Sequence, residues 1–575
     1  MSSSHGRNDV NASRTTDPTP ASTGASGASR EACPAPENVV SRFIEAAGRA
    51  PERPAIVVDR GGRVENVSYG TLSRRAAGMA AALAGASISV GDRVIVMVPV
   101  SVDLYAIILS ILSMGAVAVF LSPWLEKRHL DGAVRDLDAA AYVGSPAAQL
   151  LRLKVPALRH VPLTFTTGRR IWRVPARLSL ASRGAGGQPL RAKPVEKDAP
   201  ALISFTSGSS GVPKGANRTH SVLRGQHDAL SSAFSFRDDD VDATMFPVTV
   251  LNNLASGVRS VVPCIDFGSD SRFDARAALS LMLREGVTTC ALPPPALDAL
   301  AERALGHPDE RPALRRILCG GAPVYDRQIP AWTDAFPETE IVIAYGSTEA
   351  EPVSHLTARE RWGARSDVRP ASPGICVGRP AATVDVRIIR VHEGPVTLSP
   401  SGWSEWEVPQ GEIGEIVVAG PHVCRDYFKN PEAVRETKIA DPSGIVWHRM
   451  GDTGYFDSEG RLWLVGRVHS TIARGGEAVH PQLVEQAALS ADGSVRRAAA
   501  VGLDDDSLGQ RVVLVLETES TDAVREAVRR RLGESRLPVD EIVVAPGPLP
   551  LDPRHRAKID YATLRAMIER EGWSK

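Results

Sequence analysis

Residues 203–220 read ISFTSGSSGVPKGANRTH, and this stretch decides the fold. Residues 203–205, with apolar Ile203 and Phe205, predict a buried strand, which runs directly into a loop rich in Gly and Ser that ends at Lys214. Backbone amides left accessible by glycine, short hydroxyl side chains and one lysine form a cradle for phosphate anions. The alternative is a plain Gly/Ser-rich surface loop, which needs neither a buried strand before it nor a lysine.

The spacing inside this loop argues against an ordinary P-loop NTPase. The Walker A motif consists of Gly, four residues of any type, and then Gly-Lys-Ser/Thr. Here Lys214 is followed by Gly215, and the glycines before Lys214 are spaced differently. The loop therefore predicts a phosphate-binding site of another class.

Helical and strand patterns alternate on both sides of the loop. Residues 69–83 repeat apolar side chains at helical spacing, and strand patterns occupy residues 93–99, 201–206, 340–345 and 414–420. This alternation predicts an α/β fold with parallel sheet. The most apolar run, residues 105–121, is interrupted by Gly115 and falls short of a bilayer span of about 20 residues, so it predicts a core helix feeding a buried strand.

The length of 575 residues exceeds what one hydrophobic core supports, so more than one domain is expected. Residues 1–35 lack large apolar side chains and predict a disordered tail, residues 36–465 a large N-terminal domain, and residues 466–575 a small α+β C-terminal domain. The small domain is expected to contain strands at 511–517 and 541–545 with a helix at 522–532 between them.

Composition limits the classes of partner and compartment. Lys plus Arg and Asp plus Glu balance at 67 each, which argues against nucleic acid or an anionic membrane as the main partner. The six cysteines are scattered without Cys-x-x-Cys spacing, so neither a disulfide framework nor a zinc site is indicated and a reducing cytoplasm fits best.

Further motifs follow the Gly/Ser-rich loop in a fixed order: Gly320-Gly321-Ala322-Pro323, Tyr345-Gly346-Ser347-Thr348-Glu349, Gly451-Asp452-Thr453-Gly454, Gly466-Arg467, and Pro553-Arg554 leading to Lys558. With Thr206-Ser207-Gly208-Ser209-Ser210-Gly211 and Lys214 they resemble the adenylate-forming superfamily of acyl-CoA synthetases, peptide-synthetase adenylation domains and luciferases. The resemblance covers roughly residues 36–570. It implies a large α/β N-terminal domain, a mobile C-terminal domain and an enzyme that binds ATP and Mg²⁺.

The chemistry implied by the resemblance is attack of a carboxylate on the α-phosphate of ATP while pyrophosphate leaves. Negative charge builds at phosphorus, so cations and fixed dipoles must offset it. By resemblance, Thr206, Ser207, Gly208, Ser209, Ser210, Gly211 and Lys214 contact the departing phosphates, Thr348 contacts phosphate and Glu349 binds magnesium. Lys558 is the lysine that swings in to neutralise the transition state.

The same resemblance places the nucleoside. Tyr345 is expected against the adenine ring, with Gly320, Gly321 and Ala322 on the other side, where only small residues admit a flat base. Asp452 suits the ribose hydroxyls because an ionised carboxylate accepts from both, and Arg467 reaches the same ribose or a phosphate.

The acceptor of the acyl group is predicted from residues 472–485, IARGGEAVHPQLVE, which resemble the matching segment of coenzyme A ligases. Gly475 and Gly476 would let the pantetheine arm pass close to the backbone. A rotating C-terminal domain would exclude water for adenylation and then admit the thiol. The family hinge is usually Asp or Lys, whereas His469 stands at that position.

The first interpretation is therefore an AMP-forming acyl-CoA ligase for a fatty or other apolar acid, its acyl pocket formed by residues 245–258 and 288–301. Residues 162–168, 345–356, 376–380 and 447–463 also resemble β-lactone synthetases of olefin biosynthesis. The second interpretation therefore keeps formation of the acyl-adenylate but changes the group that accepts the acyl chain. The second step would then be β-lactone closure, amide formation or loading of a carrier protein. A nucleotide-binding scaffold without catalysis is the third interpretation.

Overall fold

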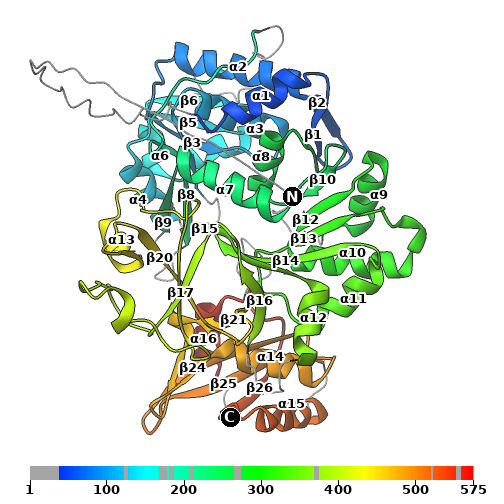
Figure 1. Ribbon diagram of the computed structural model, residues 1–575, viewed down its shortest axis with the longest axis vertical. Coiled ribbons are helices and arrows are strands. Elements are labelled where there is room, and N and C mark those ends of the chain that lie inside the picture. Colours follow the sequence, from blue (N-terminus) through cyan, green and yellow to red (C-terminus); the bar gives the residue numbers. More distant parts are fainter. Residues whose placement is uncertain are drawn as a thin grey trace, which may run out of the picture. The chain divides into compact units, whose positions relative to one another are not determined.

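The computed structural model describes residues 38–121, 127–167, 178–179, 187–207, 213–264, 273–367, 374–519, 522–551 and 559–573. Over these residues the chain forms three β-sheets covered by helices (Figure 1). The helices are α1 (Ser41–Arg49), α2 (Tyr69–Gly85), α3 (Val102–Ser113), α4 (Lys127–Leu137), α5 (Pro146–Gln149), α6 (Pro156–His160), α7 (His220–Ala233), α8 (Pro247–Ser256), α9 (Ala275–Glu285), α10 (Pro294–Gly306), α11 (Gln328–Ala335), α12 (Ala358–Asp367), α13 (Pro431–Thr437), α14 (Pro481–Ala491), α15 (Asp522–Glu534) and α16 (Tyr561–Glu571).

The first sheet carries the Gly/Ser-rich segment at one edge. Its order is β7 (Leu178–Ser179), β6 (Leu163–Thr166), β5 (Ala141–Gly144), β3 (Arg93–Met97), β4 (Val117–Phe120), β8 (Pro200–Ser207) and β9 (Pro213–Thr219). All neighbours run parallel except the β8–β9 hairpin. Alternate residues of β3 pack against α2 and α3 on one face and against α4 and α6 on the other, which explains its continuous apolar sequence.

The second sheet contains the strands of the remaining large-domain motifs. Its order is β17 (Asp385–Ile389), β18 (Gly414–Ala419), β20 (Val446–Phe456), β21 (Leu462–Arg467), β16 (Ile375–Pro380), β15 (Ala350–Thr357), β14 (Glu340–Ser347), β13 (Arg316–Cys319), β12 (Thr289–Leu292), β10 (Val241–Thr244), β11 (Arg259–Val262), β1 (Pro54–Asp59) and β2 (Val64–Ser68), with β19 (Lys438–Ala440) on β20. Helices α9, α10 and α11 pack on its parallel strands.

The apolar run in the first part of the chain forms the core helix and strand that its sequence predicted. Every residue of α3 except Asp103 is buried, because α3 lies in a core built from strands of both large sheets and from α1, α2 and α8. Gly115 then turns the chain into β4 at a φ of 73°. In the described part of the chain no helix is both long and apolar enough to cross a membrane.

The C-terminal sheet is small and mostly antiparallel. It contains β23 (Glu477–Val479), β22 (Ile472–Arg474), β25 (Gly509–Glu517), β24 (Arg497–Asp505) and β26 (Glu541–Val544). Val512 and Leu514 face α14 and α15, whereas Val513 and Val515 face α16, so both faces of β25 are covered. The α/β class with a smaller C-terminal sheet is thereby confirmed, while the domain boundaries and the motion of the C-terminal part stay predictions.

One strand expectation was wrong in its pairing. The alternation along the chain predicted parallel strands, and residues 414–420 do form β18, but β18 pairs antiparallel with both β17 and β20. Parallel neighbours need a crossover, usually a helix, and residues 390–413 between β17 and β18 form no α-helix, only irregular segments, isolated β-bridges and a short 3-10 helix.

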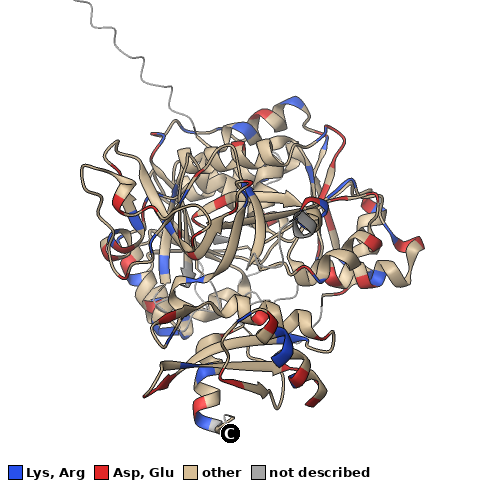
Figure 2. Ribbon diagram, turned by 60° about the horizontal axis from the view of Figure 1, so that its bottom comes forward, with Lys and Arg blue, Asp and Glu red and all other residues tan. Residues whose placement is uncertain are grey.

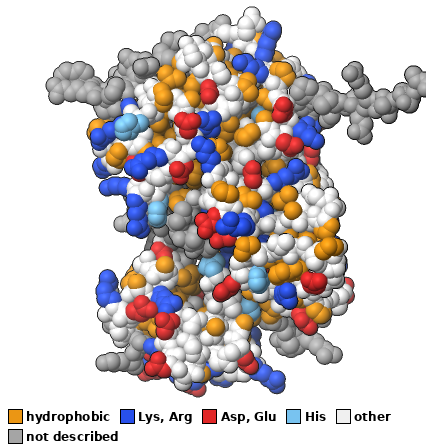
Figure 3. All heavy atoms as spheres, turned by 90° about the vertical axis from the view of Figure 1, so that its left-hand side faces the viewer, with side chains coloured by type: hydrophobic (Ala, Val, Ile, Leu, Met, Phe, Trp, Pro, Cys, Tyr) orange, Lys and Arg blue, Asp and Glu red, His pale blue; other side chains and the backbone are white. Residues whose placement is uncertain are grey.

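Charged side chains of both signs are interspersed over the strands and helices (Figure 2) and over the face drawn in Figure 3. This distribution matches the equal totals of 67 basic and 67 acidic residues.

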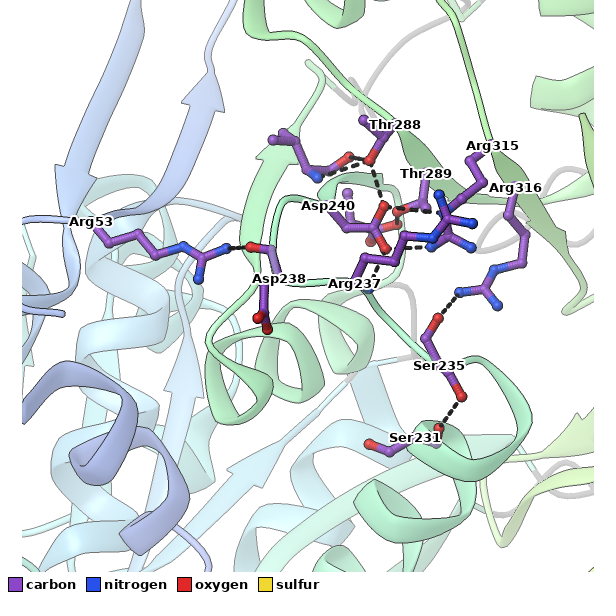
Figure 4. Close-up of polar contacts among 12 residues, drawn as sticks. Arg53, Ser231, Ser235, Arg237, Asp238, Asp240, Thr288, Thr289, Arg315 and Arg316 are labelled. Atoms are coloured by element: carbon purple, nitrogen blue, oxygen red, sulfur yellow. Dashed lines mark hydrogen bonds and ion pairs between the residues drawn. The ribbon is translucent and has the colours of Figure 1, made fainter. Parts of the chain in front are cut away.

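A charged cluster ties together the amino ends of the parallel strands in the second sheet. Asp240, Thr288 and Arg315 directly precede β10, β12 and β13 (Figure 4). The Asp240 carboxylate accepts hydrogen bonds from the Thr288 hydroxyl at 2.8 Å, the Arg237 backbone N–H at 2.7 Å and the Arg315 guanidinium. Burial alone would raise the pKa of Asp240, but these hydrogen bonds outweigh it and lower the pKa below its ordinary value of 3.8.

We expect Asp240→Asn to destabilise the protein by about 1–3 kcal/mol at neutral pH, because it removes a buried charge from hydrogen-bonded partners. A carboxyl group with a lowered folded pKa stabilises the fold above pH 3.8, and this contribution is lost as the pH falls through the folded pKa. Thermal unfolding midpoints of wild type and variant should therefore converge below pH 3.8. Asp239→Asn, at an exposed neighbour, is the control. A constant difference between wild type and Asp240→Asn down to about pH 3 contradicts the assignment.

Candidate active site

The β8–β9 hairpin holds the segment predicted to bind phosphate. The two strands pair so that Thr206 lies opposite Lys214 and Ser207 opposite Pro213. Lys214 is 14% exposed, and its ammonium lies 3.7 Å from the carboxylate of Glu436. The hairpin loop, with Gly208, Ser209, Ser210 and Gly211, lies outside the described residues. The pairing places Thr206 and Lys214 on either side of that loop.

The glycine motif lies at the carboxyl edge of the second sheet, where α/β proteins bind ligands. Gly320, Gly321 and Ala322 follow β13 directly. A Cβ at Gly320 would lie 2.9 Å from the carbonyl oxygen of Ala344, the residue before Tyr345, so only glycine fits there. The structure therefore brings the glycine motif against the strand that carries Tyr345.

Tyr345, Asp452 and Arg467 form one hydrogen-bonded group. The Tyr345 hydroxyl donates to Asp452 Oδ2 at 2.7 Å, and Arg467 Nε lies 2.9 Å from Asp452 Oδ1. Asp452 and Arg467 are direct partners on the antiparallel strands β20 and β21. Burial, and next the charge of Asp452, raise the pKa of Tyr345 well above its ordinary value of 10.0, so its hydroxyl stays a donor.

Thr348 and Glu349 form the two-residue turn between β14 and β15, where Ser347 pairs with Ala350. Glu349 Oε1 accepts a hydrogen bond from the Tyr427 hydroxyl at 2.9 Å, and the Glu349 carbonyl accepts one from the Cys424 N–H at 2.7 Å. The turn is thus anchored through both its backbone and its carboxylate.

The remaining predicted residues lie in the C-terminal part. Gly475 and Gly476 form the two-residue turn between β22 and β23 at φ angles of 59° and 85°, a conformation that itself favours glycine. The turn is open, because a Cβ at Gly476 would meet nothing within 4 Å. His469 lies in a 3-10 helix (Val468–Ser470) directly after β21. Lys558 lies outside the described residues.

Comparison with known proteins agrees with this arrangement. The family model described as AMP-binding enzyme matches residues 43–428. An olefin beta-lactone synthetase of Stenotrophomonas maltophilia (strain K279a) is 33% identical over 559 residues, covering 93% of this chain and 99% of the relative.

The chain belongs to the AMP-binding enzyme family. This AMP-binding enzyme is also 29% identical to 2-hydroxy-7-methoxy-5-methyl-1-naphthoate–CoA ligase of Streptomyces carzinostaticus, over 92% of the chain and 93% of the relative. Its fold matches ATP-bound MatB from Rhodopseudomonas palustris with a TM-score of 0.75 at 22% identity, over 92% of the chain and 99% of that structure. Members of the family activate acids by forming adenylates, and this chain is an adenylate-forming, acid-activating enzyme.

Four residues around the site of this AMP-binding enzyme were missed from the sequence: Tyr427, Lys438, Arg218 and His448. Lys438 is 7% exposed and donates to the Cys424 carbonyl at 2.5 Å, and the Arg218 guanidinium donates to Ser204 Oγ at 2.6 Å. Lys438 lies opposite His448 on β19 and β20. His448 lies within residues 447–463, whose resemblance to β-lactone synthetases was a signal for this region. Lys438 carried no such signal, because the sequence does not show that a single lysine in a strand is buried.

The donor set of this AMP-binding enzyme fits a magnesium ion that is shared with a nucleotide. Mg²⁺ is held in such sites by one or two carboxylates together with substrate phosphates and waters. Glu349 would supply one carboxylate through Oε2, because the bond from Tyr427 engages Oε1. Over the described residues no group of three or more His, Cys, Asp or Glu side chains forms a closed metal cage.

Proposed function

We propose that the enzyme activates a β-hydroxy carboxylic acid with ATP and then closes the acyl-adenylate to a β-lactone. The observation that carries this proposal is the near full-length identity of 33% to an olefin beta-lactone synthetase, which exceeds the 29% to a CoA ligase. This identity favours β-lactone closure over transfer to coenzyme A, which residues 472–485 had indicated first.

In the first step a substrate carboxylate oxygen attacks the α-phosphorus, and the bond from that phosphorus to the bridging oxygen of pyrophosphate breaks. The electron pair leaves with pyrophosphate, so charge grows on the departing oxygens. Lys214 and the Gly/Ser-rich segment before it would offset this charge, and Thr348 would contact the same phosphates. Magnesium held by Glu349 would neutralise phosphate charge and orient the leaving group.

The nucleoside is bound by the group around Tyr345. Its ring would lie against one side of the flat base and the glycine motif against the other. The close approach of Gly320 to the Ala344 carbonyl brings that motif beside the strand of Tyr345. Each Asp452 oxygen accepts one bond from Tyr345 or Arg467 and keeps a further lone pair for a ribose hydroxyl. Tyr345 and Arg467 therefore orient the Asp452 carboxylate before ATP arrives.

In the second step the β-hydroxyl oxygen attacks the acyl carbonyl carbon, and the bond between that carbon and the AMP oxygen breaks. AMP leaves with the electron pair, and the hydroxyl proton passes to solvent. The reaction needs no external nucleophile, so a C-terminal part that excludes water would protect the adenylate from hydrolysis.

Coenzyme A transfer is the second candidate, favoured by the glycine turn at Gly475 and Gly476. Gly476 leaves open space beside the backbone, which a pantetheine arm requires, whereas a Cβ at Gly475 would lie 4.0 Å from Leu508 Cδ2. The positive φ angles of the turn explain the same glycines without any ligand, so this support is weaker than the full-length identity.

The test is mass spectrometry of reactions with ATP, Mg²⁺ and pooled fatty, β-hydroxy and aromatic acids, with and without coenzyme A. We expect a β-lactone and AMP from β-hydroxy acids, with yields independent of coenzyme A. Acyl-CoA formed only in the complete mixture overturns lactone closure in favour of the second candidate. Accumulation of the adenylate of a β-hydroxy acid without lactone also overturns closure, while it leaves adenylation intact.

A further inference from the structure

One short segment contacts both parts of the site that are assigned to phosphate and metal. Residues 424–428 run along β9: Ala216 bridges to Tyr427, the Phe428 N–H donates to the Gly215 carbonyl at 2.8 Å, and Cys424 Sγ donates to the Asn217 carbonyl at 3.3 Å. The segment is thereby fixed to β9, the strand that carries Lys214.

The same segment holds the Glu349 turn through two further bonds. The Cys424 N–H donates to the Glu349 carbonyl at 2.7 Å, and the Tyr427 hydroxyl donates to Glu349 Oε1 at 2.9 Å. Tyr427 is 6% exposed, so solvent competes little for its hydroxyl. One carboxylate oxygen of Glu349 thus has a fixed direction, and the direction of Oε2 follows from it.

A buried cation supports the segment from behind. The Lys438 ammonium donates to the Cys424 carbonyl at 2.5 Å and lies 5.0 Å from the centre of the Tyr427 ring. Lys438 is 7% exposed, and Glu349 lies close enough to act on it electrostatically. The Lys438 ammonium beside the ring helps to keep Tyr427 in place.

We propose that residues 424–428, together with Lys438, form a positioning strap that sets the Glu349 carboxylate relative to the Lys214 hairpin for metal-bound ATP. Tyr427 is the positioning residue of this strap and acts through Glu349. The inference rests on the proposed roles of Glu349 and Lys214. Binding of a metal ion alone requires the Glu349 carboxylate but not a particular distance between it and Lys214. A metal ion shared with a nucleotide requires both the carboxylate and that distance. The strap is therefore expected to affect the complex of enzyme, metal ion and nucleotide.

The test measures binding of Mn²⁺, as a spin probe for Mg²⁺, in the presence of the α,β-methylene analogue of ATP. Tyr427→Phe deletes only the hydroxyl and is expected to raise the apparent Kd of Mn²⁺ about tenfold, as expected for one lost hydrogen bond to a carboxylate. The KM for metal-ATP should rise in parallel, with kcat changed less. The matched control is Tyr142→Phe, which removes a buried hydroxyl that donates to the Ala148 carbonyl at 2.7 Å in the first sheet.

A double variant separates positioning from general structural damage. If Tyr427 acts through Glu349, Tyr427→Phe added to Glu349→Gln causes no further loss of Mn²⁺ affinity. Wild-type Mn²⁺ affinity in Tyr427→Phe, with reduced affinity in Glu349→Gln, overturns the strap and keeps the metal role of Glu349. Additive losses in the double variant overturn the strap as well. Unchanged affinity in Glu349→Gln instead overturns the assignment of Glu349, on which the strap rests.

Discussion

Replacing Lys558 by alanine is expected to lower the rate of acyl-adenylate formation about 100- to 1,000-fold, the range measured when one preorganised donor to a developing anion is removed. The carboxylate and the α-phosphate are both anions, and charge grows further as pyrophosphate leaves. The measurement is exchange of labelled pyrophosphate into ATP with a β-hydroxy acid. Conversion of chemically prepared acyl-adenylate should change far less, because that step needs no cation at the departing pyrophosphate.

The matched control for Lys558→Ala is Lys154→Ala, at an exposed lysine that caps a short 3-10 helix (Leu150–Leu153). It removes the same charge and side chain from an exposed position that belongs to none of the site motifs. Exchange within about threefold of wild type in Lys558→Ala would contradict the assigned role, whereas a large loss in both variants would point to a change in net charge or folding.

Glu415→Gln is expected to destabilise the part of the protein around β20 by about 3–5 kcal/mol, the cost of leaving a buried charge without its partner. Arg449 donates to Glu415 Oε2 through Nε at 3.0 Å and through Nη2 at 2.6 Å, and the two side chains are 8% and 3% exposed. The other Arg449 nitrogen–hydrogen groups donate to the carbonyls of Gly394, Glu436 and His392. The ion pair thus holds strand β20, which carries Asp452.

The measurement for Glu415→Gln is the midpoint of thermal unfolding, which should fall by several degrees. Glu407→Gln is the control, because the Arg387–Glu407 pair has the same chemistry at 2.8 Å but side chains that are 35% and 42% exposed. Exposed pairs contribute about 0–1 kcal/mol, so this variant should unfold close to wild type. Equal unfolding midpoints for Glu415→Gln and Glu407→Gln would contradict this prediction, because the buried ion pair would then contribute no more to stability than the exposed pair.

The ordered motifs led to most of the candidate site because each is a short local pattern. The Gly/Ser-rich loop after a buried strand was recognisable from residues 203–220 alone, and the glycines at Gly475 and Gly476 occupy backbone conformations that favour glycine. Sequence reasoning did not show that Tyr345 donates to Asp452, because 107 positions separate them and their contact depends on how β14 and β20 lie in one sheet.

The positions found only in the structure share a physical cause. Tyr427 and Lys438 read as ordinary surface or strand residues, since burial of a polar group is a property of the neighbours that surround it. Likewise, Arg327 donates to the carbonyls of Val495 and Arg496, which joins the chain after the glycine motif to the C-terminal sheet. No periodicity in either segment indicates that contact.

The sequence by itself determined the α/β class and the buried helix and strand within residues 105–121, because composition, periodicity and spacing are properties of neighbouring residues. The ordered motifs indicated ATP-dependent acid activation through their resemblance to a known family. Only the tertiary structure decided that β18 runs antiparallel, that Tyr345, Asp452 and Arg467 form one group, and that residues 424–428 connect Lys214's hairpin to Glu349. These depend on pairing between strands far apart in the chain, whose register is selected by burial of whole sheet faces.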